Sequence, residues 1–308
     1  RHLSSDKEAV RSIGTGAGMI TRKQKRSILY ILFVFILCSA AKDFEFLVLK
    51  TDETFLAENI FCKIFAILVI SQCLVERKLS WRSIGFRLKG IKKGLILGFS
   101  LGLSTFAISY LAEFLILFFM GKSPRLSFYI SNFALSDQTV TGISLSALLI
   151  CILGNVINVT AEEGLFRGLI FKLGRRAFST RSANFIQALL FGIWHLVIVT
   201  VWFKEGSLTL GAAFLMGVGY IILAGILGFE WGLCVTLTGT IWTGIFEHFF
   251  NNFISNSLHV VTDTGADELQ ILRIVLSNIL SLLLVLFLMK RSKKRKRRSP
   301  EGRRTSDR

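Results

Sequence analysis

Long apolar runs constrain this chain more than any other feature of its sequence. Several of them reach the roughly 20 residues that a helix needs to cross the hydrocarbon core of a bilayer. A backbone in lipid must satisfy its own hydrogen bonds, and apolar runs of this length do so as helices rather than as barrel strands. The chain has 308 residues and a mean hydropathy of +0.58. The sequence therefore predicts an all-α fold, a polytopic bundle of transmembrane helices.

The charges of the loops indicate how the helices are oriented. Loop 77–93 carries seven Lys/Arg and no acidic residue, whereas loop 255–269 carries three acidic residues and no Lys/Arg. Because cytoplasmic loops are enriched in Lys and Arg, this alternation predicts an integral membrane protein with both termini cytoplasmic. It agrees with about eight apolar segments, which we place at residues 27–41, 59–76, 94–120, 143–171, 183–203, 208–229, 231–254 and 270–289.

The net charge of +17 comes largely from the C-terminal tail, residues 290–308. This tail holds 11 Lys/Arg against two acidic residues and directly follows an apolar segment. A basic block in that position is typical of a cytoplasmic anchor near anionic lipid headgroups. The pattern favours membrane lipid as a partner and argues against nucleic acid. Another basic stretch begins at Met19, which is compatible with a start there and with residues 1–18 as a processed or spurious extension.

Gly94, Gly98 and Gly102 form a stripe of small residues along the third apolar segment. This spacing lets helix backbones approach closely in a membrane. We expect a neighbouring helix to pack against the stripe, although the spacing is common and does not indicate a function.

The stretch AEEGLFRG, residues 161–168, places two acids and a base within the fourth apolar segment. Glu163 and Arg167 are four residues apart, so they can pair on one face of a helix, which reduces the cost of burying either charge. Glu162 lies about 100° around the helix and has no such local partner. An unpaired buried carboxylate usually has a partner on another helix or an altered pKa, which is the profile of a general acid or base.

Two histidines fall within the fifth and seventh apolar segments. FGIWH places Phe191 and His195 on one helical face, and EHFFNN does the same for His248 and Asn252. Intramembrane ionisable residues are usually functional, because exposing them to lipid is costly. A single histidine could equally be a buried hydrogen-bonder between helices. A carboxylate, two imidazoles and an amide together favour activation of a water and polarisation of a carbonyl.

Taken in order, these patterns resemble the signature EExxxR, FxxxH, HxxxN of the CAAX protease and bacteriocin-processing (CPBP, or Abi) family of intramembrane proteases. The resemblance covers roughly residues 143–255. It implies that Glu162 and His195 activate a water for attack on a peptide carbonyl, and that His248 and Asn252 stabilise the oxyanion. The substrate would be a peptide or lipidated peptide near the membrane, CAAX-type or related to bacteriocins. We expect the protein to lie in a bacterial cell membrane.

The resemblance also bears on supporting residues and on cofactors. It implies that the pair Glu163–Arg167 is mainly architectural. The family has been described both as metalloproteases and as metal-independent glutamate proteases. A zinc ion could be held by Glu162, His195 and His248 in a three-ligand catalytic site. The amide of Asn252 is a poor zinc ligand and a good oxyanion donor, so we favour a mechanism without a cofactor and keep zinc as the alternative.

On this basis the chain divides into five parts. They are a basic N-terminal cytoplasmic segment (1–26), N-terminal transmembrane helices (27–142), a CPBP-like catalytic core (143–255), an outer loop with the last transmembrane helix (256–289), and a basic cytoplasmic tail (290–308).

Other functions remain open at this stage. A non-catalytic or self-immunity membrane protein could keep the same fold. An ion- or proton-coupled transporter could use Glu162, His195 and Glu113 as a relay. Glu113 has no motif partner, so we predict an interhelical or interface residue there. Glu247, directly before His248, is predicted to be either a further site group or a lipid-interface residue.

Overall fold

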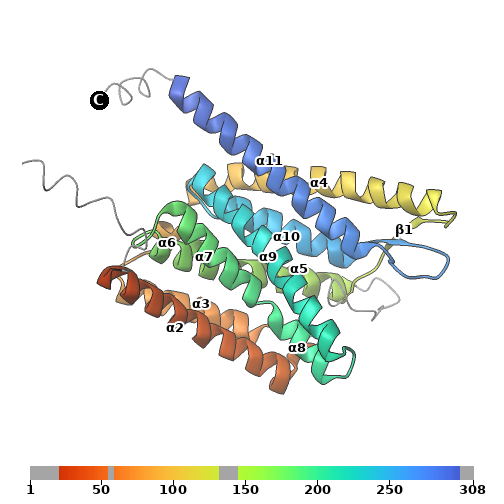
Figure 1. The fold of residues 1–308 in the computed structure, drawn as a ribbon, viewed down its shortest axis with the longest axis horizontal. Coiled ribbons are helices and arrows are strands. Elements are labelled where there is room, and N and C mark those ends of the chain that lie inside the picture. The colour runs from red at the N-terminus through yellow and green to blue at the C-terminus, as the bar shows by residue number, and fades with distance from the viewer. Residues whose placement is uncertain (1–20, 55–58, 132–144, 299–308) are drawn as a thin grey trace, which may run out of the picture.

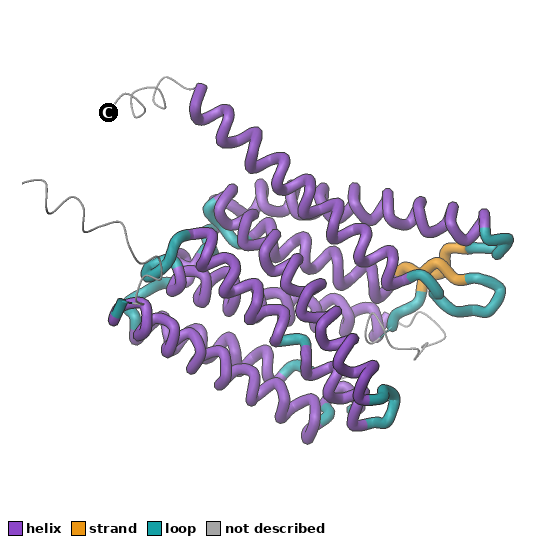
Figure 2. The backbone as a smooth tube through the Cα atoms, viewed as in Figure 1, coloured by secondary structure: helices purple, strands orange, loops and turns teal. Residues whose placement is uncertain are grey.

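Helices dominate the computed structural model, which describes residues 21–54, 59–131 and 145–298 (Figures 1 and 2). This confirms the predicted all-α fold. The proposed start at Met19 lies outside the described residues, as do residues 1–20, 132–144 and 299–308 of the predicted terminal and linking segments.

The α-helices follow the apolar segments. They are α2 (Arg22–Phe44), α3 (Phe61–Glu76), α4 (Ile91–Phe119), α5 (Leu145–Glu163), α6 (Phe171–Gly174), α7 (Thr180–Ile193), α8 (Leu196–Lys204), α9 (Leu210–Thr238), α10 (Trp242–Ser257) and α11 (Gln270–Arg298). Two π-helical stretches extend α2 and join α5 to α6, at Glu45–Leu49 and Gly164–Ile170. Short 3₁₀ turns lie at Thr51–Glu53, Trp81–Ile84 and Leu88–Gly90.

Five helical stretches of the described chain are long and apolar enough to cross a membrane. They are Trp81–Phe119, Leu145–Gly174, Thr180–Lys204, Leu210–Thr238 and Gln270–Arg295. The predicted segments 59–76 and 231–254 correspond to α3 and α10, which have 16 residues each. The chain is thus an all-α membrane protein in which spans of full length are combined with shorter helices.

The helices are arranged so that α5, α7, α9 and α10 lie between two outer groups. On one side α2 packs against α3, and α3 packs against α5; on the other side α4 packs against α10 and α11. The start of α2 and the end of α11 lie at the same end of the bundle, opposite the pair of short strands (Figure 1). The central helices carry the residues of the predicted catalytic core.

The glycine stripe of α4 sets its distance from α10, as predicted. A Cβ atom on Gly98 would lie 2.6 Å from the carbonyl oxygen of Thr243 and 2.9 Å from the amide nitrogen of Glu247. These are backbone atoms, which cannot move aside as a flexible side chain can. The close approach therefore positions α10, the helix that carries His248.

Two helix boundaries in the core differ from the prediction. The sixth and seventh segments were divided at Glu230, but α9 continues to Thr238 and ends where Gly239 adopts a left-handed conformation (φ +74°). A charged residue did not end the helix because Glu230 is buried against other helices. The later start of α10 at Trp242 places His248 about 9 Å along that helix.

The predicted fifth segment, 183–203, is also not one helix. It divides into α7 and α8 with a break at Trp194 and His195, where the amide nitrogen of His195 bonds to the carbonyl oxygen of Gly192 at 3.2 Å. The apolar pattern runs through this point without interruption, so it gave no sign of the break.

Two short strands lie at the end of the bundle opposite the start of α2 and the end of α11 (Figure 1). β1 (Arg125–Phe128) pairs antiparallel with β2 (Leu258–Val261), with Ser127 opposite His259. His259 stacks on Tyr129 with ring centroids 3.8 Å apart, and its Nδ1 lies 3.1 Å from Asp267 Oδ2. Burial tends to raise the pKa of Asp267, but hydrogen bonds with His259 and Arg273 outweigh it and hold that pKa below its ordinary value.

Glu113 lies between helices, which was one of the two alternatives predicted for it. Its carboxylate pairs with the guanidinium of Arg273, so α4 is joined to α11 by a buried ion pair. Arg273 also bonds to Asp267, with Nη2 2.6 Å from Oδ2. The charge of Glu113 is therefore compensated within the outer part of the bundle.

We predict that Gly98→Ala lowers the thermal stability of the detergent-solubilised protein, by about 1–3 kcal/mol, because overpacking forces α4 away from α10. Gly219→Ala is the matched control, since Gly219 is also within a helix but has no neighbouring atom within 4 Å of a Cβ. Thermal unfolding of both variants measures the difference. Equal stability of the two would show that the contact between α4 and α10 adjusts freely.

Candidate active site

The four predicted catalytic residues line one cavity of about 250 Å³. Its walls come from the end of α2 and the π-helical stretch after it, from the start of α3, from α5, from the α7–α8 break and α8, and from α9, α10 and the start of α11. The structure thus brings Glu162, His195 and the pair His248–Asn252 together, from parts of the chain 33 to 90 residues apart. The lining residues used below are Lys42, Glu162, Trp194, His195, His248 and Asn252.

Glu162 has one fixed oxygen and one without a hydrogen bond. Its Oε1 accepts a hydrogen bond from the indole nitrogen of Trp194 at 2.8 Å. Its Oε2 lies 3.7 Å from Nε2 of His248 and has no hydrogen-bond partner among the described residues. Glu162 has no partner on its own helix, as predicted, and its partners come from the α7–α8 break and α10. The fixed oxygen orients the carboxylate and leaves the other for chemistry.

His195 is positioned by the helix break itself. Its Nδ1 lies 2.8 Å from the carbonyl oxygen of Phe191, four residues earlier. A carbonyl oxygen can only accept, so Nδ1 carries the proton in this contact. In the neutral ring this leaves Nε2 with its lone pair, available as a base. The FxxxH spacing therefore has a structural reason, because the carbonyl of Phe191 sets the tautomer of His195.

His248 lies between the two adjacent glutamates of α5. Its Nδ1 is 3.1 Å from Oε1 of Glu163, while its Nε2 faces Glu162. Its ring stacks on the indole of Trp231 with centroids 4.2 Å apart. A carboxylate accepts hydrogen bonds, so Glu163 keeps a proton on Nδ1. Contact with Glu163 and Trp231 fixes the plane of the ring.

The predicted pair of Glu163 and Arg167 is confirmed. Arg167 Nε lies 3.3 Å from Glu163 Oε2, and both side chains are fully buried. The guanidinium lies over the rings of Phe191 at 3.9 Å and Trp231 at 4.7 Å. These contacts stabilise a cation that has little water around it. Glu163 consequently joins Arg167 to His248, a link that the sequence did not predict.

Local backbone features make this burial possible. Arg167 lies in the π-helical stretch Gly164–Ile170, and π-helical turns are frequent at functional sites. Gly244 on α10 faces Glu163, where a Cβ atom would lie 2.7 Å from Oε2. A side chain at this position would displace the carboxylate, so glycine lets α10 approach α5 closely.

Lys42, directly after the predicted apolar segment 27–41, is a cavity residue that the sequence did not predict. It is buried because α2 continues to Phe44, and its Nζ donates to the carbonyl oxygen of Trp194 at 3.2 Å. The ammonium also lies 4.4 Å from the ring of Trp194. The position of a lysine directly after an apolar run does not indicate whether its side chain points into the bundle or out of it. Its positive charge faces the same cavity as Glu162.

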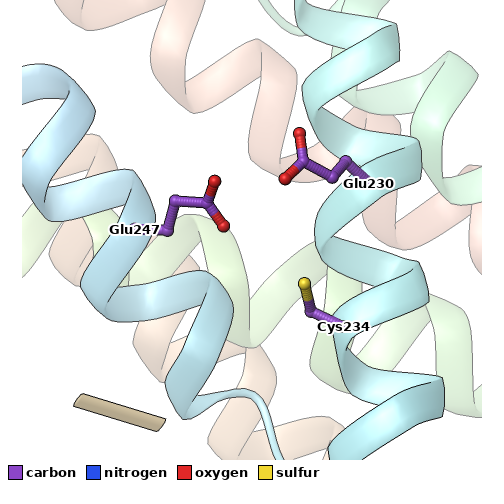
Figure 3. A group of neighbouring side chains, drawn as sticks. All are labelled: Glu230, Cys234 and Glu247. Atoms are coloured by element: carbon purple, nitrogen blue, oxygen red, sulfur yellow. The ribbon is translucent and has the colours of Figure 1, made fainter. Parts of the chain in front are cut away.

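A second buried acidic cluster lies between α9 and α10 (Figure 3). The carboxylates of Glu230 and Glu247 point toward one another with Cys234 beside them, and their donor atoms lie within 4.8 Å. Ser281 on α11 bonds to Glu247 and, at 2.6 Å, to Glu230. Glu247 is therefore not a lipid-interface residue, and it does not line the cavity that holds His248.

One of three comparisons with known proteins gives a match, and it covers the helices that carry the cavity residues of α5, the α7–α8 break and α10. Buried acid and imidazole groups around a cavity in an all-α bundle define a membrane protein with a candidate hydrolytic site. Residues 144–254 match the family model described as type II CAAX prenyl endopeptidase Rce1-like. This match confirms the resemblance of the core to the CAAX protease and bacteriocin-processing family, and it includes all three motifs. Comparison with the curated proteins and with the solved structures gives no significant match.

We predict that Arg167→Gln destabilises the protein by roughly 3–5 kcal/mol, because it leaves the carboxylate of Glu163 buried without its cation. The double variant Glu163→Gln/Arg167→Gln should recover part of this loss, since it removes both charges. Thermal unfolding of the two single variants and the double variant measures the coupling. Strict additivity would contradict the pairing.

Proposed function

We propose that this chain is an intramembrane endopeptidase in which Glu162 and His195 activate a water to hydrolyse a peptide bond near the membrane. The observation that carries the proposal is the common cavity of Glu162, His195, His248 and Asn252, which come from three separate parts of the chain. The match of residues 144–254 to a prenyl endopeptidase family supports it at the level of the family.

Water activation depends on the two bases that face the cavity. Oε2 of Glu162 has no hydrogen-bond partner, and Nε2 of His195 keeps a lone pair because Nδ1 is held by Phe191. A water between these groups can lose a proton to one of them as its oxygen attacks the carbonyl carbon. The same proton then passes to the leaving amine when the C–N bond breaks. Trp194 keeps the Glu162 carboxylate in place during both steps.

Two residues of α10, Asn252 and His248, would stabilise the oxyanion. The amide of Asn252 can donate directly to the developing negative charge. For His248 to donate from Nε2 while Nδ1 remains bonded to Glu163, the ring must carry both protons. The carboxylates of Glu162 and Glu163, which face the two ring nitrogens of His248, then offset the charges of the imidazolium and of Arg167 together. The supporting pair thereby sets the electrostatic state of an oxyanion donor as well as the helix geometry.

By residue type the donor set also suits zinc, although among the described residues it is Glu230, Cys234 and Glu247 that bring three donor atoms within 4.8 Å of one another. His195 and His248 each have Nδ1 held by a second group, as zinc-ligating histidines usually do, and Glu162 keeps an unbonded oxygen. These three residues would hold the ion, which would lower the pKa of a bound water and polarise the substrate carbonyl. We propose the metal-free route because the amide of Asn252 suits an oxyanion and not a metal.

We propose that the substrate is a peptide or lipidated peptide of the CAAX type or related to bacteriocins. Membrane association of the substrate agrees with the family and with a cavity inside an apolar bundle. The cavity wall combines polar groups with apolar side chains such as Phe46, Trp202 and Leu223, which suits a substrate with a lipid or apolar part. We further propose that the protein lies in a bacterial cell membrane with both termini cytoplasmic.

Of the two alternative functions, the transporter gains no support from the position of Glu113. That residue pairs with Arg273 and does not line the cavity with Glu162 and His195. A binding or self-immunity protein with the same fold differs from an endopeptidase only by lacking turnover, so an activity measurement separates them.

We predict that Glu162→Gln and His195→Ala each reduce peptidase activity by at least about 10²-fold, because each removes an acid–base group. The assay uses purified protein in detergent with a panel of prenylated C-terminal peptides and bacteriocin-precursor peptides. Glu76→Gln, an exposed carboxylate outside the cavity, is the control and should keep full activity. Activity that survives both cavity variants would rule out the mechanism, and a wild-type protein inactive on the whole panel would favour the non-catalytic alternative.

We also predict that treatment with a chelator leaves the activity of the purified enzyme unchanged. Elemental analysis before and after treatment should find no stoichiometric zinc that depends on His195 or His248. Activity lost on chelation and restored by zinc would replace the metal-free route with the zinc route, in which the same residues hold the ion.

A further inference from the structure

A basic groove lies at the end of the bundle that carries the start of α2, away from the catalytic cavity. Its volume is about 720 Å³. The lining residues come from α2, from the end of α3 and from the segment after α6. Five cations and no carboxylate line it: Arg22, Lys23, Arg26, Arg77 and Arg176. We propose that this groove binds the headgroup of an anionic phospholipid, a site that the proposed peptidase function does not require.

The arrangement of residues along α2 matches the shape of a phospholipid. Arg22 and Arg26 are four residues apart and are followed on the same side by Leu29 and Phe33, so one stripe changes from basic to apolar along the helix. The side chains of Leu29 and Phe33 are 67% and 61% exposed. A phosphate can lie among the cations while an acyl chain follows the apolar part of the stripe.

The groove is preformed by contacts between its walls. Gln24 Nε2 donates to the carbonyl oxygen of Ala177 at 3.1 Å, and Ser27 Oγ donates to that of Leu173 at 3.2 Å. The guanidinium of Arg77 lies 3.7 Å from the ring centroid of Tyr30. These contacts hold the start of α2 against the segment after α6, so cations from separate helices converge without rearrangement. A fixed site loses less conformational entropy on binding than a flexible charged tail.

The positive charge of the groove indicates that its ligand is an anion. The carboxylate of Glu76 accepts a hydrogen bond from the hydroxyl of Tyr30 at 3.0 Å, so among the described residues the five lining cations outnumber this neighbouring carboxylate. At a membrane boundary the abundant anion with an apolar part is an anionic lipid.

The test measures lipid binding to the full-length purified protein by native mass spectrometry and by the shift of its melting temperature. Phosphatidylglycerol should bind and raise the melting temperature, whereas phosphatidylcholine should do neither. In Arg26→Gln/Arg77→Gln/Arg176→Gln, affinity for phosphatidylglycerol should fall by at least about tenfold, since each basic residue near a lipid surface contributes appreciably.

The matched control is Arg82→Gln/Lys89→Gln/Lys93→Gln, which removes three exposed charges from the neighbouring loop and the start of α4 outside the groove. This control should bind phosphatidylglycerol like the wild type. Equal losses in the two triple variants would overturn the proposal in favour of diffuse surface attraction. A melting shift reproduced by inorganic phosphate alone would identify a soluble phosphate site instead and also overturn it. Neither result bears on peptidase activity.

Discussion

The cost of placing charges inside an apolar bundle is the constraint on which the rest of this structure depends. The buried carboxylate of Glu163 contacts Arg167, four residues later, and His248 on α10. The indole of Trp231 lies against both the guanidinium of Arg167 and the ring of His248. Removing water strengthens each of these interactions and also makes each unpaired group expensive. The network therefore fixes how α5, α9 and α10 must pack, and it leaves Glu162 facing the cavity.

Close helix packing follows from the same requirement. Short ion-pair and hydrogen-bond distances between helices require the backbones to approach closely, and glycines allow this at Gly98 against α10 and at Gly244 against Glu163. The break between α7 and α8 has a related effect, because it places Trp194 and His195 at the cavity instead of along a continuous helix. Stability and site geometry in this molecule thus depend on the same few contacts.

The sequence was sufficient for the class of fold, for the pair Glu163–Arg167 and for four of the residues that share the cavity, namely Glu162, His195, His248 and Asn252. Long apolar runs form helices in lipid because a helix satisfies the hydrogen bonds of its own backbone, and charges within such runs must find partners. The sequence did not predict the division between α9 and α10, because it does not distinguish a glutamate buried within a helix, such as Glu230, from one that ends a helix. Lys42 was missed for the same reason, since a charge directly after an apolar run did not reveal that α2 continues and carries it inward.

The strands β1 and β2 show a further limit, because pairing of Ser127 with His259 joins segments more than 100 residues apart and leaves no local pattern. What the sequence determined by itself was local: helix-forming runs, i,i+4 pairs and the identity of the reactive groups. Only the tertiary structure decided which oxygen of Glu162 is held by Trp194, which nitrogen of His248 faces Glu163, and which carboxylates share Ser281. These are contacts between helices, and their geometry exists only once the bundle has packed.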